Sequence, residues 1–287
     1  MSLFQLSESL LSQRWSEAVK GRLQSIFFSG ANVHSFQQHC EQFAHQQNIQ
    51  LLPYQFTGRL DNLPFSPFLD ICQYLVKRDQ VDPETLVKQA DVYWHHRELF
   101  LSLFGSEGHQ REEPPLNHEL NYERLELQGS IYRILQTLTK DQPIFIALAS
   151  CHLATPTVHY LLKYLDEFEL KGHMLVAIQF DQGFQLSLED DLGIWQQFID
   201  YVEEEHICIE LPPLDPETEP DLIKWPSPRR AGGDPEGQVK MAEQQASFFG
   251  HTESRLWAEE LIRRRHSGEL KIDDDQEMRI NRCIGSA

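Results

Sequence analysis

Residues 143–165, PIFIALASCHLATPTVHYLLKYL, combine a short apolar run, a turn of small residues and a segment with apolar residues at helical spacing. An uninterrupted apolar run that ends in a turn is typical of a strand buried on both faces of a parallel sheet. The segment that follows is then the crossover helix leading to the next parallel strand. Upstream, residues 121–140 repeat leucine and isoleucine at helical spacing, which predicts the helix that delivers the chain to this strand.

The same two patterns alternate along most of the chain. Further strands are predicted at residues 23–29, 49–56, 173–180 and 206–211. Further helices are predicted at residues 3–20, 36–47, 82–104 and 187–205, the third with Asp82 as N-cap and Pro83 at the first helical position. Strands that alternate with helices predict an α/β fold with three layers, in which a parallel sheet is covered on both faces.

The composition changes after the last predicted strand. Residues 212–237 are dense in proline, glycine and charged residues, which is typical of a linker or a long loop. Residues 238–265 and 273–284 then predict two helices, which resemble the start of a helical-repeat array. We therefore expect an α/β domain at residues 1–211, a linker at 212–237 and a helical extension at 238–287. The uncapped end at residues 285–287 is what we expect of a fragment of a longer protein.

Charge and cysteine content narrow the classes of partner. In 287 residues, 44 Asp and Glu outnumber 25 Lys and Arg, for a formal net charge of −19. Such a charge repels phosphate backbones and argues against general binding to nucleic acid or anionic membranes, although a local basic patch stays open. Apolar runs are too short to span a bilayer, and no export signal opens the sequence. The five scattered cysteines predict neither a disulfide framework nor a zinc knuckle, so we expect reduced thiols and a cytoplasmic protein.

The segment 143–165 resembles the second nucleotide motif of the STAND class of P-loop NTPases. That motif commonly reads Pro, an apolar run, Asp-Asp-Leu-His-Trp-Ala-Asp, Pro and a leucine-rich helix. Here the apolar run, His152 and the two prolines match, whereas the acidic pair falls on Ala149 and Ser150. Residues 64–68, PFSPF, also match the family's Pro-Tyr-x-Pro-Phe stretch. The resemblance implies a P-loop or AAA-like fold whose metal-binding carboxylates are missing.

A phosphate loop should follow the first strand if the resemblance holds. Its pattern, Gly-x-x-x-x-Gly-Lys-Ser/Thr, holds phosphates with successive backbone N–H groups and one lysine. Gly30 supplies the first glycine, but the second falls on Ser35, the lysine on Phe36 and the metal-binding hydroxyl on Gln37. A bulky Phe36 in place of a positive charge predicts a large loss of phosphate affinity. The degenerate nucleotide site is therefore expected at Gly30, Ser35, Phe36, Gln37, Ala149, Ser150 and His152.

Other polar clusters suggest metal or nucleophile chemistry. The metal candidates are His34, His39, Cys40 and His45 on one predicted helix, and Asp91 with His95 four residues apart on another. Without a closed ligand set we expect solvated helix faces and no metal. Cys151 and His152 could form a nucleophile and its base, but adjacent residues of a strand point to opposite faces. An enzyme of unrelated chemistry is therefore the least favoured reading, and no catalytic residue is assigned.

Two expectations for function remain. The first is a catalytically inactive regulatory or scaffold domain of a bacterial-type signalling protein, which binds a protein partner or its own downstream domain. Its interaction surface is expected on the helical extension, around Phe248, Phe249 and Trp257. The alternative is a sensor that binds ATP, ADP or another small molecule without hydrolysing it. No cofactor is expected under the first reading, and the oligomeric state is not predicted.

Overall fold

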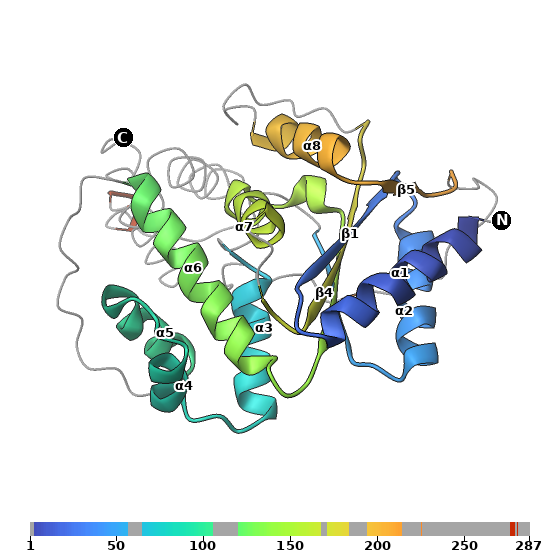
Figure 1. Ribbon diagram of the computed structural model, residues 1–287. Helices are drawn as coiled ribbons and strands as arrows, with labels where there is room; N and C mark the ends of the chain where they lie inside the picture. Colours follow the sequence, from blue (N-terminus) through green and yellow to red (C-terminus); the bar gives the residue numbers. More distant parts are fainter. Residues whose placement is uncertain are drawn as a thin grey trace.

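The computed structural model describes residues 3–56, 65–105, 120–167, 171–183 and 194–213, together with residues 225, 276–278 and 280. In these residues five parallel strands form one sheet in the order β2-β3-β4-β1-β5 (Figure 1). The strands are β1 (Gln24–Ser29), β2 (Leu51–Gln55), β3 (Ile144–Ala149), β4 (Met174–Phe180) and β5 (Cys208–Glu210). All five predicted strands are confirmed, and the chain has an α/β fold with a parallel sheet.

Helices cover both faces of the sheet, as the unbroken apolar strands require. On one face α1 (Leu3–Val19) and α2 (Val33–Gln47) pack on Phe28, Phe145 and Ala177. On the other face lie α3 (Phe68–Arg78), α6 (Leu120–Leu138), α7 (Pro156–Glu167) and α8 (Ile194–Glu205). Figure 1 shows α1 and α2 on the side of the sheet opposite to α3, α6 and α7. The three layers predicted from the sequence are confirmed.

The central strands form the core that the opening segment predicts. Ile144, Ile146 and Leu148 of β3 are fully buried, as are Leu175 and Ile178 of β4 beside them. At the edge of the sheet, β2 contains Pro53. Proline cannot donate a ladder hydrogen bond and therefore fits an edge strand rather than a central one. The predicted burial of the central strands is confirmed.

The helix after β1 begins earlier than the sequence predicted. It starts at Val33 rather than at Phe36, because Asn32 is an N-cap whose side-chain oxygen accepts from the backbone N–H of Ser35 at 2.9 Å. A capping oxygen satisfies one of the free N–H groups at a helix start and so fixes that start. The connection between β1 and α2 is consequently only Gly30, Ala31 and Asn32.

The single helix predicted at residues 82–104 is wrong. Asp82 caps α4 and Pro83 is its first residue, as predicted, but α4 (Pro83–Gln89) is short. Asp91 then adopts a left-handed conformation (φ 49°) that stops the helix. The chain resumes as η2 (Trp94–His96) and α5 (Arg97–Leu103). The N–H groups of Asp91 and Val92 donate back to the carbonyls of Lys88 and Val87, which closes the end of the helix. Arg133 of α6 also donates to the Asp91 carbonyl at 2.5 Å.

Part of the predicted C-terminal half lies outside the described residues. The helix predicted at 187–205 is described from Ile194 onward as α8. Of the helical extension, residues 276–278 and 280 are described and are helical, which agrees with the helix predicted at 273–284. The linker and the domain boundary at residue 211 stay predictions.

Candidate functional site

The order of the strands marks one place where a ligand site is expected. After β1 the chain passes to α2 on one face, and after the neighbouring β4 it passes to α8 on the other face. Loops that leave adjacent strands for opposite faces open a crevice at the carboxyl ends of those strands, where open α/β sheets bind ligands. The predicted site residues Gly30, Ala149, Ser150 and His152 lie at or just after the carboxyl ends of β1 and β3.

The side chain of Gln179 occupies this edge and joins β1 to β3. Gln179 lies near the end of β4, between the two strands, and is fully buried. Its side-chain oxygen accepts from the N–H of Ser150 at 2.6 Å, and its amide nitrogen donates to the carbonyl of Gly30 at 2.6 Å. The N–H of Ser150 and the carbonyl of Gly30 are therefore bonded within the protein.

Two backbone conformations shape the same edge. Ser150 is left-handed (φ 58°, ψ 41°), which turns the chain sharply out of β3. A residue other than glycine in this region costs about 1–3 kcal/mol and persists only when its surroundings hold it, as Gln179 does here. Gly30 has φ 121°, and a β-carbon on it would lie 3.3 Å from that of Leu211. Glycine is required there by both the conformation and the close approach.

The loop after β1 has no room for a phosphate cradle. The pattern needs four residues between its two glycines, but here α2 begins three residues after Gly30. Ser35, Phe36 and Gln37 consequently lie in the first turns of α2 rather than in a loop. The N–H of Ser35 is used by the Asn32 cap, and the side chain of Gln37 donates to that of Gln55 at 3.4 Å.

Phe36, which stands where the lysine would be, is fully buried between two aromatic rings. Its ring centroid lies 5.1 Å from that of Phe28 on β1 and 5.7 Å from that of Trp225. The indole N–H of Trp225 donates to the carboxylate of Glu41 on α2 at 2.7 Å. Next to this contact, Asn32 donates to the carbonyl of Pro212 at 3.0 Å. Pro212 and Trp225, which follow β5 in the sequence, thus contact α2 and its N-cap.

Cys151 and His152 do not lie in a strand, contrary to the sequence interpretation. Both belong to η3 (Cys151–Leu153), the turn that follows the left-handed Ser150. Burial raises the pKa of the Cys151 thiol above its ordinary value, which keeps it protonated and unreactive. Burial also lowers the pKa of His152, and the nearby Asp181 carboxylate offsets this only in part. The N–H of Asp181 donates to Nδ1 of His152 at 3.1 Å, so a neutral ring accepts there.

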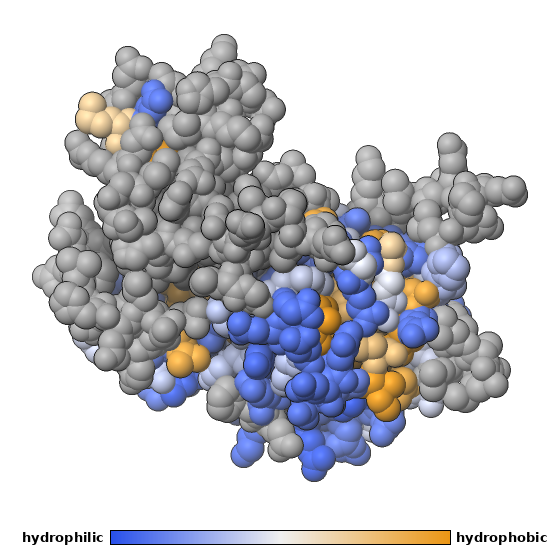
Figure 2. Space-filling model, turned by 90° about the horizontal axis from the view of Figure 1, so that it is seen from above, coloured by the Kyte–Doolittle hydropathy of each residue, from blue (hydrophilic) through white to orange (hydrophobic). Residues whose placement is uncertain are grey.

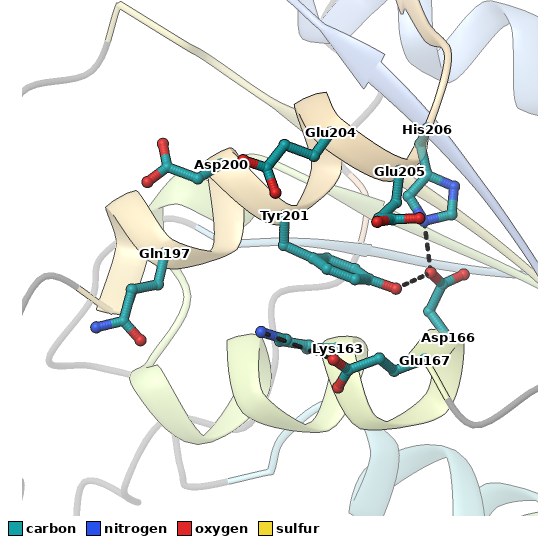
Figure 3. A pocket seen from close by; sticks show the side chains of 9 residues that line it. All are labelled: Lys163, Asp166, Glu167, Gln197, Asp200, Tyr201, Glu204, Glu205 and His206. Carbon is teal, nitrogen blue, oxygen red and sulfur yellow. Dashed lines mark hydrogen bonds and ion pairs between the residues drawn. The ribbon is translucent and has the colours of Figure 1, made fainter.

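A second feature is a groove of about 690 Å³ between α7 and α8, shown in Figure 3. Seen from above, the described residues around α8 are mostly hydrophilic (Figure 2). The groove is lined by Lys163, Asp166, Glu167, Gln197, Asp200, Tyr201, Glu204, Glu205 and His206. It lies toward the amino-terminal edge of the sheet, because Asp166 is near the end of α7 and bonds to Ser25 at the start of β1. Parallel sheets bind ligands at the opposite edge.

Asp166 is the centre of the interactions in this groove. The hydroxyl of Tyr201 donates to it at 2.5 Å, and Nε2 of His206 lies 2.6 Å from the same oxygen. Burial raises the pKa of Asp166, but the bonds from His206, Tyr201 and Ser25 outweigh burial and leave the pKa below its ordinary value. Burial and the adjacent carboxylate raise the pKa of Tyr201. An ionised Asp166 and a neutral Tyr201 join two helices and do not supply an acid and a base near pH 7.

The residues considered as metal ligands lie apart or bond to other groups of the protein. Asp91 and His95 are not on one helix, because the chain breaks between them; His95 pairs with Glu126 at 2.8 Å instead. On α2, Nδ1 of His39 bonds to the carbonyl of Ser35 and His34 bonds to Gln38. Within the described residues, no three His, Cys, Asp or Glu side chains gather in a way that could hold a metal ion.

Sequence reasoning missed the side chains that fill the edge. Gln179 was detectable as the one amide inside the apolar run of residues 173–180. Trp225 had a weaker signal, a single tryptophan in a segment otherwise rich in proline and charge. The predicted interaction residues Phe248, Phe249 and Trp257 lie outside the described residues, so that surface stays a prediction.

Comparisons with protein-family models, with curated proteins and with solved structures find no match to this chain. Among the helices that the structure describes, none combines the length and the apolar character needed to cross a membrane.

Proposed function

We propose that this chain is a catalytically inactive, P-loop NTPase-like domain that serves as a regulatory or scaffold module in a cytoplasmic, bacterial-type signalling protein. Its role is to bind a protein partner or its own downstream domain. The resemblance to STAND and AAA-like NTPases places a phosphate loop after the first strand and acidic residues after the third. In support, β1 and β3 end at the same edge of the sheet with only β4 between them.

One observation carries the proposal of inactivity. Phe36, at the position of the phosphate-binding lysine, is fully buried between Phe28 and Trp225. Phosphoryl transfer depends on cations that neutralise the charge of the transferred group and on a carboxylate that holds the metal ion. Ala149 and Ser150 stand at the acidic positions and carry no charge. The residues at these motif positions therefore meet neither requirement.

The alternative function is a sensor that binds a nucleotide or another small molecule and does not turn it over. The observation in its favour is that His152 and Asp181 lie next to the left-handed Ser150 at the carboxyl edge of the sheet. A ligand there would have to displace Gln179 from its bonds to Ser150 and Gly30. Displacement leaves buried polar groups to be satisfied again, which lowers the affinity.

Calorimetric titration with ATP, ADP and GTP in the presence of Mg²⁺ separates the two functions, and a phosphate-release assay tests inactivity. We expect no phosphate release above buffer and no binding heat. Binding without turnover would favour the sensor. Mg²⁺-dependent turnover that recurs in independent preparations would overturn the proposal of inactivity. A Gln179→Glu variant tests the role of Gln179 at the carboxyl edge. It keeps the size of the side chain and removes the side-chain N–H that the Gly30 carbonyl accepts.

A further inference from the structure

The contact between Trp225 and α2 has the composition of a specific recognition site. The ring of Phe36 packs against the Trp225 indole edge to face, with an interplanar angle of 67°, and Phe28 lies beneath Phe36. Aromatic pairs favour this geometry. The indole N–H meets the Glu41 carboxylate at 2.7 Å, a charge-assisted hydrogen bond. Phenylalanine has no such donor, so Glu41 selects tryptophan among apolar side chains.

Trp225 comes from a segment rich in proline and charge. Residues 214–224, LDPETEPDLIK, contain two prolines and four carboxylates, and residues 226–237 continue with proline, glycine and charge. Such composition does not form a core of its own. Trp225, in contrast, is only 6% exposed. It is the residue of this stretch that the structure describes, and it packs against α2.

We propose that α2 carries a binding site for a linear peptide segment that presents a tryptophan, and that Trp225 fills this site within the same chain. The site consists of Phe36, Glu41 and the supporting Phe28. A second copy of the segment around Trp225 is the ligand that the chemistry defines. The contact then acts as an autoinhibitory latch, because a partner segment must displace Trp225 to bind.

The latch supplies a specific binding surface for the proposed scaffold role. Only that role rests on the proposed function, whereas the peptide site itself does not. It also places the surface on the described body at α2, in addition to the one expected at residues 238–287. Nucleotide binding is not involved, so failure of the calorimetric test leaves the peptide test below unaffected, and the reverse also holds.

The test titrates a fluorescent peptide of residues 219–231, EPDLIKWPSPRRA, into the full chain and follows its anisotropy. The variant Trp225→Ala empties the site and should bind the peptide. Because Trp225 belongs to the same chain as its site, its effective concentration there is of order 1 mM. For a peptide Kd of about 100 µM, the parent chain should therefore bind about tenfold more weakly than the variant. A peptide with Trp225→Phe should bind the emptied site about tenfold more weakly than the parent peptide, since it lacks the donor for Glu41.

Two controls make the result specific. Trp94→Ala removes a tryptophan that is 69% exposed and leaves the latch in place, so it should bind the peptide as weakly as the parent. Adding Glu41→Gln to Trp225→Ala should weaken peptide binding, because the acceptor loses its charge.

The proposal is overturned if Trp225→Ala, with a parental circular dichroism spectrum, binds the peptide no better than the parent chain. If Trp225→Ala does not fold, Trp225→Phe in the chain decides. It keeps the ring and loses the donor, so it competes less well within the chain and should bind the peptide more tightly than the parent. Equal binding by a folded Trp225→Phe chain would equally overturn the latch.

Discussion

Single polar side chains do much of the positioning in this molecule because they are buried and bonded on both sides. Gln179 spans from Ser150 to Gly30 and so ties the ends of three strands together. His96 is another such residue: it is 4% exposed, and its Nδ1 lies 3.0 Å from the hydroxyl of Ser130 on α6. Groups of this kind stabilise one arrangement, since leaving either partner unsatisfied costs about 1–3 kcal/mol.

Burial, with a smaller contribution from the adjacent His95, lowers the pKa of His96 from 6.5 to about 4. The unfolded chain therefore binds a proton near pH 6.5, whereas the folded chain resists it until about pH 4. Stability conferred by the neutral ring is complete above pH 6.5 and is lost as the pH falls toward 4, by about 1–3 kcal/mol. Urea unfolding of the parent and of His96→Gln at several pH values measures this effect. His96→Gln should reduce the change in the free energy of unfolding between pH 6.5 and about 4. His45→Gln, at an exposed position of α2, should not. An unchanged slope in His96→Gln would assign the pH dependence to other groups.

Among the elements, α7 and α8 are joined by two kinds of contact. Apolar side chains pack at one end of the pair, and a polar bridge joins the helices across the groove at the other end. Trp195 and Phe198 of α8 pack on His159 of α7 near the carboxyl edge of the sheet. Toward the other edge lies the acidic groove, where Asp166 bridges the helices by accepting from Tyr201 and contacting His206 (Figure 3). The carboxylates along α8 lie on the solvent side, where they keep the surface hydrophilic.

Replacement of Asp166 by Asn should destabilise the fold by about 1–3 kcal/mol at pH 7, because Tyr201 and His206 lose a charged partner. The pKa of Asp166 is lowered from 3.8 in the folded chain. Its stabilisation is therefore present above pH 3.8 and disappears as the pH falls through the lower folded value. Denaturant melts at pH 7 and pH 3 check both statements. The control is Glu167→Gln, whose partner Lys163 is 3.9 Å away on the surface and whose loss should cost under about 0.5 kcal/mol. Equal losses in the two variants would show that Asp166 is not the bridge.

At the scale of the whole molecule, the sheet lies between two separate apolar cores formed by the residues that the structure describes. The core under α1 and α2 contains small residues, Ala147 and Ala177, which let α2 approach the sheet closely. The core under α3, α6, α7 and α8 is larger and contains Ile146 and Ile178. Because both cores share β3 and β4, a defect in either central strand affects the entire fold.

Ile146→Asp tests that statement. Ile146 is fully buried on the central strand β3, so the variant places an unpaired carboxylate inside the sheet. A buried unpaired charge typically costs more than about 4 kcal/mol, comparable to the whole stability of a domain. We expect loss of soluble expression, measured as soluble yield. The same substitution at Ile207, which is 79% exposed, should express like the parent. A well-folded Ile146→Asp chain would contradict the central position of β3.

Local sequence was enough to locate the regular elements whose pattern is strong. The apolar runs around residues 144–149 and 174–180 became β3 and β4, since a strand buried on both faces needs nothing but apolar residues. Pro83 and Asp82 likewise marked the start of α4 correctly. The departures from the two nucleotide motifs at Ser35, Phe36, Gln37, Ala149 and Ser150 were also evident from residue type alone.

Long-range contacts decided what residue type and periodicity cannot encode. The closure of the carboxyl edge depends on Gln179 reaching Gly30, which is 149 positions away in the sequence. Trp225 contacts Phe36 and Glu41 after β5 has paired with β1. The bond from Asn32 to the Pro212 carbonyl fixes the chain next to this contact. In each case the energy comes from pairing groups that are distant along the chain, so the determining partner is absent from any local window of sequence.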